Sequence, residues 1–174
     1  MELPASELLF DEPSILAAVD HVAEYLNTVC QDGTWLILCV MNGGLVFTAD
    51  LMKRLEFKVT LDFVQVSRYH NKTEGTELTW HAKPSTSLQG AQILLVDDIF
   101  DEGETMLALD QYCIDNGAER VLSVVLLEKT HGREKVRFRP EIVGLKCPDK
   151  YVFGYGMDYE GYHRNLPEIY YLEE

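Results

Sequence analysis

The hydrophobic pattern of the chain switches between strand spacing and helix spacing. Two continuous apolar runs, at 35–40 and 93–96, and a largely apolar run at 120–127 are typical of strands that are covered on both faces of a parallel sheet. Helical spacing precedes the first run, at 11–30, and follows it, at 45–55. Strands that alternate with helices predict an α/β fold with a central, mostly parallel sheet flanked by helices.

The remaining elements are predicted from shorter patterns. Asp11 or Ser14 can cap the first helix, and Gly117 is the expected C-cap of a helix that follows the second apolar run. Residues 59–66 alternate as a strand does, whereas 67–87 is a long polar segment that we interpret as a lid or a solvated hairpin. Short strands are also expected at 141–145, 151–154 and 169–172, and the last of these should close the sheet.

Carboxylates are concentrated at the end of one predicted strand. The apolar run 93–96 leads directly into Asp97 and Asp98, and a helical pattern begins near Thr105. Open α/β sheets bind their ligands at the carboxyl ends of the strands, which is where these acids lie. Three more acidic residues follow within the same loop: Asp101, Glu102 and Glu104.

This loop combines main-chain donors with acidic side chains. The N–H groups of a loop that opens a helix carry partial positive charge and suit a phosphate, and the Thr105 hydroxyl can assist. The acidic side chains would repel a phosphate, but they can accept hydrogen bonds from sugar hydroxyls and attract Mg²⁺. A ligand with a phosphate, a ribose diol and a metal-bound diphosphate satisfies all of these groups.

Other interpretations of the acidic loop are possible. Asp97 and Asp98 could end a strand in a receiver-like phospho-acceptor domain, or form a plain turn. A phosphatase of the aspartyl-phosphate type requires two aspartates two residues apart, and Asp98 and Asp101 are three apart. A Walker loop requires Gly-Lys-Ser/Thr after four spacer residues, which this sequence does not contain. The spacing therefore favours the site for a ribose phosphate.

Two more predicted strands end in polar groups. The strand at 35–40 ends in Asn42-Gly43-Gly44, and the strand at 120–127 ends near Lys129. Because parallel strands have their carboxyl ends at one edge of the sheet, these segments and the acidic loop are expected to face a single cleft. Arg68 and Tyr69 begin the polar segment, and a lid would bring them over a diphosphate.

Composition limits the class of protein. The chain has 174 residues, which we interpret as one domain, and its net charge of −14 argues against binding nucleic acid or an anionic membrane. The four cysteines show no metal-ligand spacing, and Cys39 and Cys113 lie inside apolar segments, so free buried thiols in a cytoplasmic protein are expected. Neither a transmembrane segment nor a signal peptide is expected, because no apolar stretch reaches 18 residues and the N-terminus lacks a basic region.

The acidic loop resembles the phosphoribosyl pyrophosphate (PRPP) motif of type I phosphoribosyltransferases: four apolar residues, two acids, two residues, Asp, a residue, Gly, a residue, Thr. Between roughly 35 and 172, further segments occur in the order found in hypoxanthine-guanine phosphoribosyltransferases: Met-Asn-Gly-Gly-Leu (41–45), Ser-Arg-Tyr (67–69), Glu-Lys-Thr (128–130) and Tyr-Val-Phe-Gly-Tyr-Gly-Met-Asp-Tyr (151–159). The resemblance implies the type I fold with a flexible lid at about 67–87. It also implies Mg²⁺-dependent purine salvage, in which PRPP and hypoxanthine or guanine give IMP or GMP and pyrophosphate.

The resemblance also implies roles for single residues. Asp101 matches the catalytic residue near purine N7, and Asp97 and Asp98 match acids that hold the ribose hydroxyls and Mg²⁺. The 5′-phosphate loop corresponds to Glu102, Gly103, Glu104 and Thr105. Pyrophosphate contacts correspond to Asn42, Gly43, Arg68, Tyr69 and Arg164, and relatives often have a non-proline cis peptide at Asn42. Purine contacts correspond to Lys129 at O6, Tyr151 stacked on the base, the Val152 backbone and Asp158, which matches a ligand of a second Mg²⁺.

The chain departs from the family pattern at several positions. Asn42 stands where many relatives have Lys, so Mg²⁺ or Arg164 must do more to neutralise pyrophosphate. Glu102 and Glu104 stand where Thr or Lys is frequent, and Arg68 where Ser is common. Xanthine or a pyrimidine therefore stays open as the base, as does a PRPP-sensing, RNA-binding regulator of the same fold, which would need a basic face. Family resemblance further implies a homo-oligomer, either a dimer or a tetramer.

Overall fold

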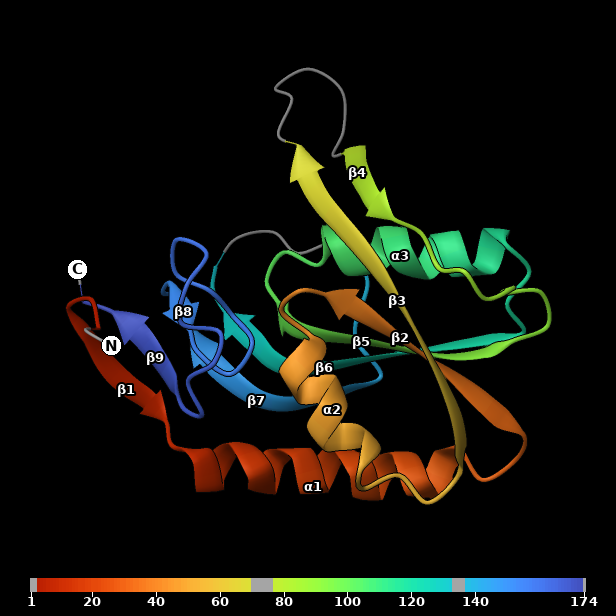
Figure 1. Cartoon of the computed structure of the whole chain (residues 1–174), viewed down its shortest axis with the longest axis horizontal. Helices are drawn as coiled ribbons and strands as arrows, with labels where there is room; N and C mark the ends of the chain where they lie inside the picture. The colour runs from red at the N-terminus through yellow and green to blue at the C-terminus, as the bar shows by residue number, and fades with distance from the viewer. Residues whose placement is uncertain (1–2, 70–76, 133–136, 174) are drawn as a thin grey trace.

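A six-stranded sheet forms the centre of the protein. The computed structural model describes residues 3–69, 77–132 and 137–173 (Figure 1). The strands of this sheet are β2 (Thr34–Met41), β3 (Lys58–Tyr69), β4 (Glu77–Ala82), β5 (Gln92–Phe100), β6 (Arg120–Thr130) and β7 (Ile142–Pro148). Their order is β4-β3-β2-β5-β6-β7, and all neighbours are parallel except β3 and β4. The predicted α/β class and mostly parallel sheet are confirmed.

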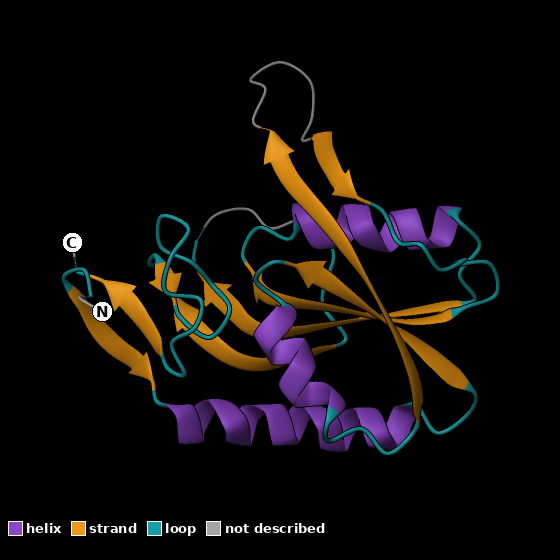
Figure 2. Ribbon diagram, viewed as in Figure 1, coloured by secondary structure: helices purple, strands orange, loops and turns teal. Residues whose placement is uncertain are grey.

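Helices cover both faces of this sheet. The first two, α1 (Glu12–Val29) and α2 (Leu45–Met52), lie on one face, and α3 (Glu104–Asp115) lies on the other (Figures 1 and 2). Successive residues of a buried strand point to opposite faces, so Ile37 joins the core under α1 and α2 while Leu38 joins the core under α3. The Asp11 side chain accepts a hydrogen bond from the Ser14 N–H at 3.0 Å, which confirms the predicted cap of α1.

A second, smaller sheet corrects the prediction that the last strand closes the central sheet. It contains β1 (Ser6–Phe10), β8 (Val152–Phe153) and β9 (Ile169–Leu172), in the order β1-β9-β8 with antiparallel neighbours. The β9 bounds are those predicted, but its partners are not. Hydrophobic alternation shows which residues of a strand are buried, whereas the pairing partner depends on the tertiary path of the chain.

The carboxyl ends of the central strands extend further than the apolar runs. The ladder between β5 and β6 continues past the acids, since Asp97 pairs with Val125 and Phe100 pairs with Glu128. Lys129 is likewise still in β6 and pairs with Cys147 of β7. Residues 97–100 and Lys129 are therefore part of the sheet and not of loops. The backbone hydrogen bonds of the sheet fix the direction of their side chains.

The polar segment 67–87 is mainly an antiparallel hairpin within the part that the structure describes. The final residues of β3 pair with β4, and Ser67 lies opposite Thr79. Residues 70–76 lie outside the described residues. The side chains of Arg68 and Tyr69 are not described either, although their backbone belongs to the end of β3. The hairpin interpretation of this segment is confirmed, and closure over a ligand stays a prediction.

A buried carboxylate anchors the chain where it returns from this hairpin. Asp62 of β3 is 8% exposed, and its Oδ2 accepts hydrogen bonds from the Ser85 N–H (2.8 Å), the Ser85 hydroxyl (3.0 Å) and the Thr86 N–H (2.7 Å). Its Oδ1 accepts one from the Phe63 N–H at 2.8 Å. Burial raises the pKa of Asp62, but the donors of Thr86, Phe63 and Ser85 outweigh it and lower the pKa to about 2.

We expect Asp62→Ala to lower the free energy of unfolding at pH 7 by about 2 kcal/mol, because the folded pKa lies below its ordinary value of 3.8. The folded state favours the charged carboxylate. Its contribution is therefore complete above pH 4 and is lost as the pH falls from there toward 2. Urea titrations of both proteins from pH 2 to pH 7 measure this difference. Asp32→Ala, at an exposed position, is the control. A difference that stays constant down to pH 2 would contradict the assignment.

Candidate active site

The predicted strand ends converge on one cavity. It has a volume of about 300 Å³ and lies at the carboxyl ends of β2, β5 and β6, beside the start of α3. Seven residues of the predicted site are in its lining: Gly43 after β2, the aspartates Asp97, Asp98 and Asp101, Gly103 and Thr105 at the start of α3, and Lys129 of β6. The expectation that three separate segments face a single cleft is confirmed.

Asp97 and Asp98 form a carboxylate pair in which Asp97 is buried and Asp98 is partly buried. The Asp98 N–H donates to Asp97 Oδ1 at 2.9 Å, and the Ile99 N–H donates to Asp98 Oδ1 at 2.8 Å. Burial, with the neighbouring charge of Asp98 second, raises the pKa of Asp97 well above its ordinary value. Burial also raises the pKa of Asp98, which hydrogen bonds and the positive charge of Arg164 counteract in part. Two adjacent acids with raised pKa values would gain from a cation or from hydroxyl donors.

The glycine turn after β2 presses against this pair. A Cβ added to Gly43 would lie 1.7 Å from Asp98 Oδ2, and one added to Gly44 would lie 2.8 Å from the Val40 carbonyl oxygen. Both positions therefore have room for glycine alone. The Met41–Asn42 peptide is cis, as the family resemblance implied. Asn42 itself is not among the residues that line the cavity.

The loop into α3 has the geometry expected of an anion-binding turn. Gly103 is the N-cap residue of α3 with φ +89°, a left-handed conformation that favours glycine. Gly103 and Thr105 line the cavity, so the first turn of α3 faces it with the positive end of the helix dipole. The first turn also contains Glu104, which sets a negative charge beside these donors.

The carboxylate of Asp101 lies between two nitrogen atoms at the end of β6. Lys129 Nζ is 3.2 Å from Asp101 Oδ2, and His131 Nε2 is 2.9 Å from Asp101 Oδ1. The exposed fractions of the Asp101, Lys129 and His131 side chains are 24%, 16% and 1%. The sequence predicted Asp101 and Lys129 as site residues but not His131. The alternation of side chains along a strand could have found it, because residues two apart point the same way.

A loop from the C-terminal part of the chain completes this edge of the sheet. Arg164 Nη2 forms an ion pair with Asp158 Oδ1 at 2.6 Å, and Arg164 Nη1 donates to the Gly156 carbonyl at 2.7 Å. A Cβ on Gly156, whose φ is +100°, would lie 2.2 Å from the Gly43 carbonyl oxygen. Gly156 therefore packs directly on the glycine turn, and its importance was also missed from the sequence. The contact brings Arg164 close enough to lower the pKa of Asp98.

Of the predicted purine-binding residues, Lys129 lines the cavity, whereas Tyr151, Val152 and Asp158 are not among its lining residues. Tyr151 is 51% exposed, and its hydroxyl donates to the Asp158 carbonyl at 3.0 Å. The Val152 side chain is buried in the core, so its backbone is the part left to face a ligand. The Asp158 carboxylate also accepts a hydrogen bond from the Gly161 N–H at 2.8 Å. Glu102 is not in the cavity lining, nor is Glu104.

Asp97 and Asp98 can contribute ligands to a Mg²⁺ ion that is bound mainly by the diphosphate of a substrate. Within the described residues, no group of three or more His, Cys, Asp or Glu side chains is arranged to hold a metal ion. Mg²⁺ commonly uses one or two carboxylates and takes its other ligands from water and substrate phosphates. Asp97 and Asp98 can supply those carboxylates, and their raised pKa values show that they lack full compensation. The residues present therefore fit a Mg²⁺ held mainly by a diphosphate.

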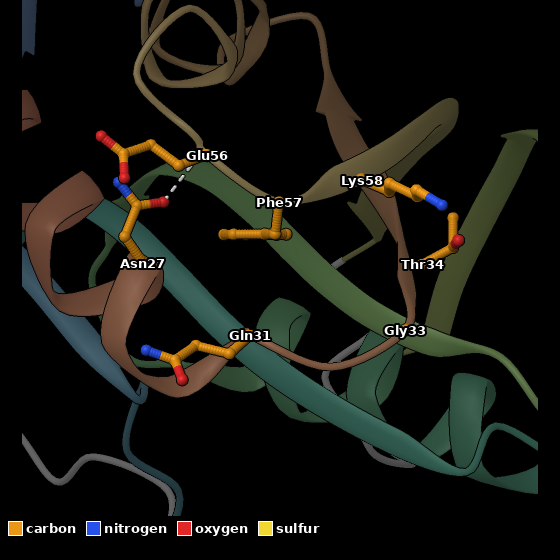
Figure 3. A pocket seen from close by; sticks show the side chains of 7 residues that line it. All are labelled: Asn27, Gln31, Gly33, Thr34, Glu56, Phe57 and Lys58. Carbon is orange, nitrogen blue, oxygen red and sulfur yellow. Dashed lines mark hydrogen bonds between the residues drawn. The ribbon is translucent and has the colours of Figure 1, made fainter.

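Another hollow, of about 550 Å³, lies at the opposite edge of the sheet, where β2 and β3 begin (Figure 3). One of its polar side chains, Asn27, already has a structural role. The Asn27 side chain donates to the Arg54 carbonyl at 3.0 Å and accepts from the Glu56 N–H at 2.9 Å, so it ties α1 to the chain before β3 (Figure 3). Size alone does not identify the site, because the smaller cavity holds the converging acids.

Known proteins are similar to this chain in sequence and in fold. Residues 6–160 match the phosphoribosyl transferase domain family. The chain is 35% identical over 170 residues to the hypoxanthine-guanine phosphoribosyltransferase of Bacillus subtilis (strain 168), a match that covers 97% of this chain and 94% of the relative. The crystal structure of a hypoxanthine phosphoribosyltransferase from Staphylococcus aureus has a TM-score of 0.90 at 30% identity and covers 96% of this chain and 91% of that one. A Trypanosoma cruzi hypoxanthine phosphoribosyl transferase, studied for the role of its C-terminal region in oligomeric state and activity, has a TM-score of 0.87 at 26% identity and covers 99% and 94%.

Proposed function

Because the chain belongs to the phosphoribosyltransferase family, we propose that it transfers the 5-phosphoribosyl group of PRPP to hypoxanthine or guanine, giving IMP or GMP and pyrophosphate in purine salvage. The observation that carries the proposal is the single cavity in which the acid pair, the glycine turn, the start of α3 and Lys129 meet. A ribose with phosphates at both ends, together with a separate purine base next to C1′, matches these groups in turn. The relatives of this length carry the same activity in their names.

The proposed chemistry is displacement at C1′ of the ribose. Asp97 and Asp98 accept hydrogen bonds from the ribose hydroxyls, and the N–H groups from Glu102 to Thr105 hold the 5′-phosphate. Asp101 accepts the N7 proton of the purine, so that N9 forms the bond to C1′ while the bond from C1′ to pyrophosphate breaks. Mg²⁺, when bound with the diphosphate, neutralises the leaving group.

Pyrophosphate is proposed to leave between the glycine turn and the C-terminal loop. Gly43 offers main-chain groups there, and Arg164 offers a cation that is held in place by Gly156 and Asp158. Asn42, which replaces the frequent Lys, adds no charge, so Arg164 has the larger share of the neutralisation. We further propose that a lid at about 67–87, within a single domain spanning 1–174, carries Arg68 and Tyr69 over the diphosphate to exclude water.

The purine is proposed to lie against Tyr151, with the Val152 backbone at its edge and Lys129 at O6. An ammonium group is a donor only, so it favours the 6-oxo acceptor of hypoxanthine over the 6-amino donor of adenine. Lys129 Nζ lies 3.2 Å from Asp101 Oδ2, and this proximity supports the proposal that the two residues contact O6 and N7 of the same purine. Asp158 is proposed to bind a second Mg²⁺, in exchange for part of its contact with Arg164.

We expect Lys129→Ala to raise the KM for hypoxanthine and guanine by about 10- to 100-fold, because a hydrogen bond to a charged group is lost. The KM for PRPP should change by no more than about 2-fold, since Lys129 is not among the groups assigned to the ribose or the phosphates. Steady-state kinetics with each substrate varied in turn measure both constants. Lys146→Ala removes an exposed lysine from β7 and serves as the charge-matched control. Equal losses for purine and PRPP would contradict this role.

The quaternary structure and location are also proposed. Three large apolar side chains on α2 and β3 are exposed to solvent. They are Leu45 of α2 (50%), and Leu61 (55%) and Phe63 (46%) of β3. Such surface favours association, and we propose a homo-oligomer, either a dimer or a tetramer. The four cysteines are free and buried, which fits the reducing cytoplasm. None of the helices in the described residues is long and apolar enough to span a membrane.

Release of pyrophosphate from PRPP with a panel of bases tests the proposed function. With Mg²⁺ present, hypoxanthine and guanine should support turnover, and adenine and uracil should not. Turnover with xanthine or with a pyrimidine alone would favour the other base specificities that the sequence left open. Salt-dependent binding of RNA without any phosphoribosyl transfer would favour a regulator of the same fold, which the net charge of −14 opposes.

A further inference from the structure

The imidazole of His131 is buried against the catalytic carboxylate and has no role in the mechanism described so far. Its side chain is 1% exposed, and Nε2 lies 2.9 Å from Asp101 Oδ1. Lys129 approaches the other oxygen, with Nζ 3.2 Å from Oδ2. Lys129 lies in β6 and His131 follows Thr130, the last residue of that strand, and both side chains reach the Asp101 carboxylate. The end of this strand thus presents one nitrogen to each oxygen of Asp101.

The ring of His131 is only partly satisfied in the described part of the chain. Nε2 is at hydrogen-bonding distance from Asp101, but the two groups are not aligned as a hydrogen bond, and Nδ1 has no partner there either. A buried polar group without a hydrogen bond is unfavourable, and such groups occur where a ligand or a reaction requires them. Catalytic hydrogen bonds are often poorly aligned without ligand and tighten when it binds. A small rotation of the carboxylate would align Nε2–H with Oδ1.

We propose that His131 is a positioning residue, which holds the Asp101 carboxylate through Oδ1 while Oδ2 accepts the N7 proton of the purine. The inference rests on the proposed function. Lys129 is needed at purine O6, so its contact with Oδ2 must weaken when the base binds. Donation from His131 then keeps the carboxylate oriented and in its charged form. The charged groups that share the cavity are Lys129, Asp97 and Asp98.

Two substitutions separate positioning from packing. His131→Leu keeps a similar volume but removes the donor, and we expect kcat with hypoxanthine to fall by about 10- to 100-fold while the KM for PRPP changes by less than about 2-fold. The acidic limb of the kcat–pH profile should move to higher pH, because Asp101 loses a donor that favours its charged form. His131→Gln places an N–H near the position of Nε2. It should therefore keep most of the wild-type kcat, and the acidic limb of its kcat–pH profile should lie at the wild-type pH.

A double-mutant cycle tests whether His131 acts through Asp101. In the Asp101→Asn background, His131→Leu should cause no further loss of kcat, since the group that it positions is no longer a base. Three results would overturn the proposal: wild-type kcat and pH profile in His131→Leu, an equal loss in His131→Gln, or a fully additive loss in the double variant. Any of these would leave His131 with a packing role.

A measurement without turnover separates this proposal from the proposed function. The ¹⁵N resonances of His131 can be assigned by their absence in His131→Gln, and the chain has five histidines in all. The Nε2 resonance should shift in Asp101→Asn and should stay unchanged in Asp32→Asn. If the wild-type protein shows that response but no phosphoribosyl transfer, the proposed function fails while the contact stands. If phosphoribosyl transfer occurs but the Nε2 resonance of His131 does not shift in Asp101→Asn, the positioning role is wrong while the proposed function stands.

Discussion

Asp101→Asn lowers kcat by about 10²–10⁴-fold, the range that a positioned general base contributes. The substitution keeps the size of the side chain and one acceptor oxygen, but it removes the basicity that accepts the N7 proton. Within the described residues, Asp101 is the carboxylate of the cavity lining that has ion-pair contacts with both Lys129 and His131. This position supports its proposed contact with purine N7, next to the Lys129 proposed to bind O6. PRPP binding should persist, because the ribose and phosphates use other groups.

Single-turnover kinetics with preformed enzyme–PRPP complex measure the chemical step of Asp101→Asn directly, and isothermal titration gives the affinity for PRPP. Asp110→Asn, on α3 and outside the cavity lining, is a matched control, which should keep wild-type kcat. Unchanged turnover in Asp101→Asn would refute the role of base. Loss of PRPP affinity equal to the loss of turnover would instead place Asp101 in the ribose site.

Gly43→Ala lowers kcat/KM for PRPP by about 10²-fold or more, the loss that follows when a catalytic group is displaced by about 1 Å. The new methyl carbon would lie 1.7 Å from Asp98 Oδ2 and 2.5 Å from Asp98 Cγ, so the carboxylate must move. Asp98 cannot move without breaking its hydrogen bond from the Ile99 N–H. The ribose hydroxyls and Mg²⁺ then lose one of the two acids proposed to hold them.

A stability control distinguishes this local effect from general destabilisation. Gly90 has φ +70° and no atom within 4 Å of an added Cβ, so Gly90→Ala should cost about 1 kcal/mol through backbone strain alone. It precedes β5, away from the acids, and should keep the wild-type KM for PRPP. If Gly43→Ala and Gly90→Ala lost stability and PRPP turnover in the same proportion, the contact between Gly43 and Asp98 would have no special role.

Much of the fold could be predicted because the buried strands have a characteristic apolar sequence. Runs such as 93–96 are apolar throughout, which only a strand covered on both faces tolerates in a chain of this composition. The second sheet could not be predicted in the same way. β1 is short and has no fully buried residue, and the pairing of β9 with β1 and β8 depends on how the chain ends meet in space. Local pattern does not contain that information.

Site residues that are neighbours in the sequence could be predicted. Site residues whose role depends on contact with a distant part of the chain were missed. Asp97 and Asp98 can be recognised in the sequence because two acidic residues directly follow an apolar strand. Gly156 does not, because its role depends on contact with Gly43 from a distant part of the chain. His131 was missed because it follows the last residue of β6, and only the strand's full length shows that it faces Asp101. The roles assigned to bound substrate stay predictions.

Amide chemical shifts on addition of PRPP and Mg²⁺ test the central claim most directly. If the turn between β5 and α3 holds the sugar phosphate, the largest changes should occur at Gly103 to Thr105 and at Gly43, with Asp97 and Asp98 following. The Asn27 and Lys58 amides, which belong to the larger hollow at the other edge of the sheet, should stay unchanged. Changes confined to that hollow, with none in the turn before α3, would contradict the account.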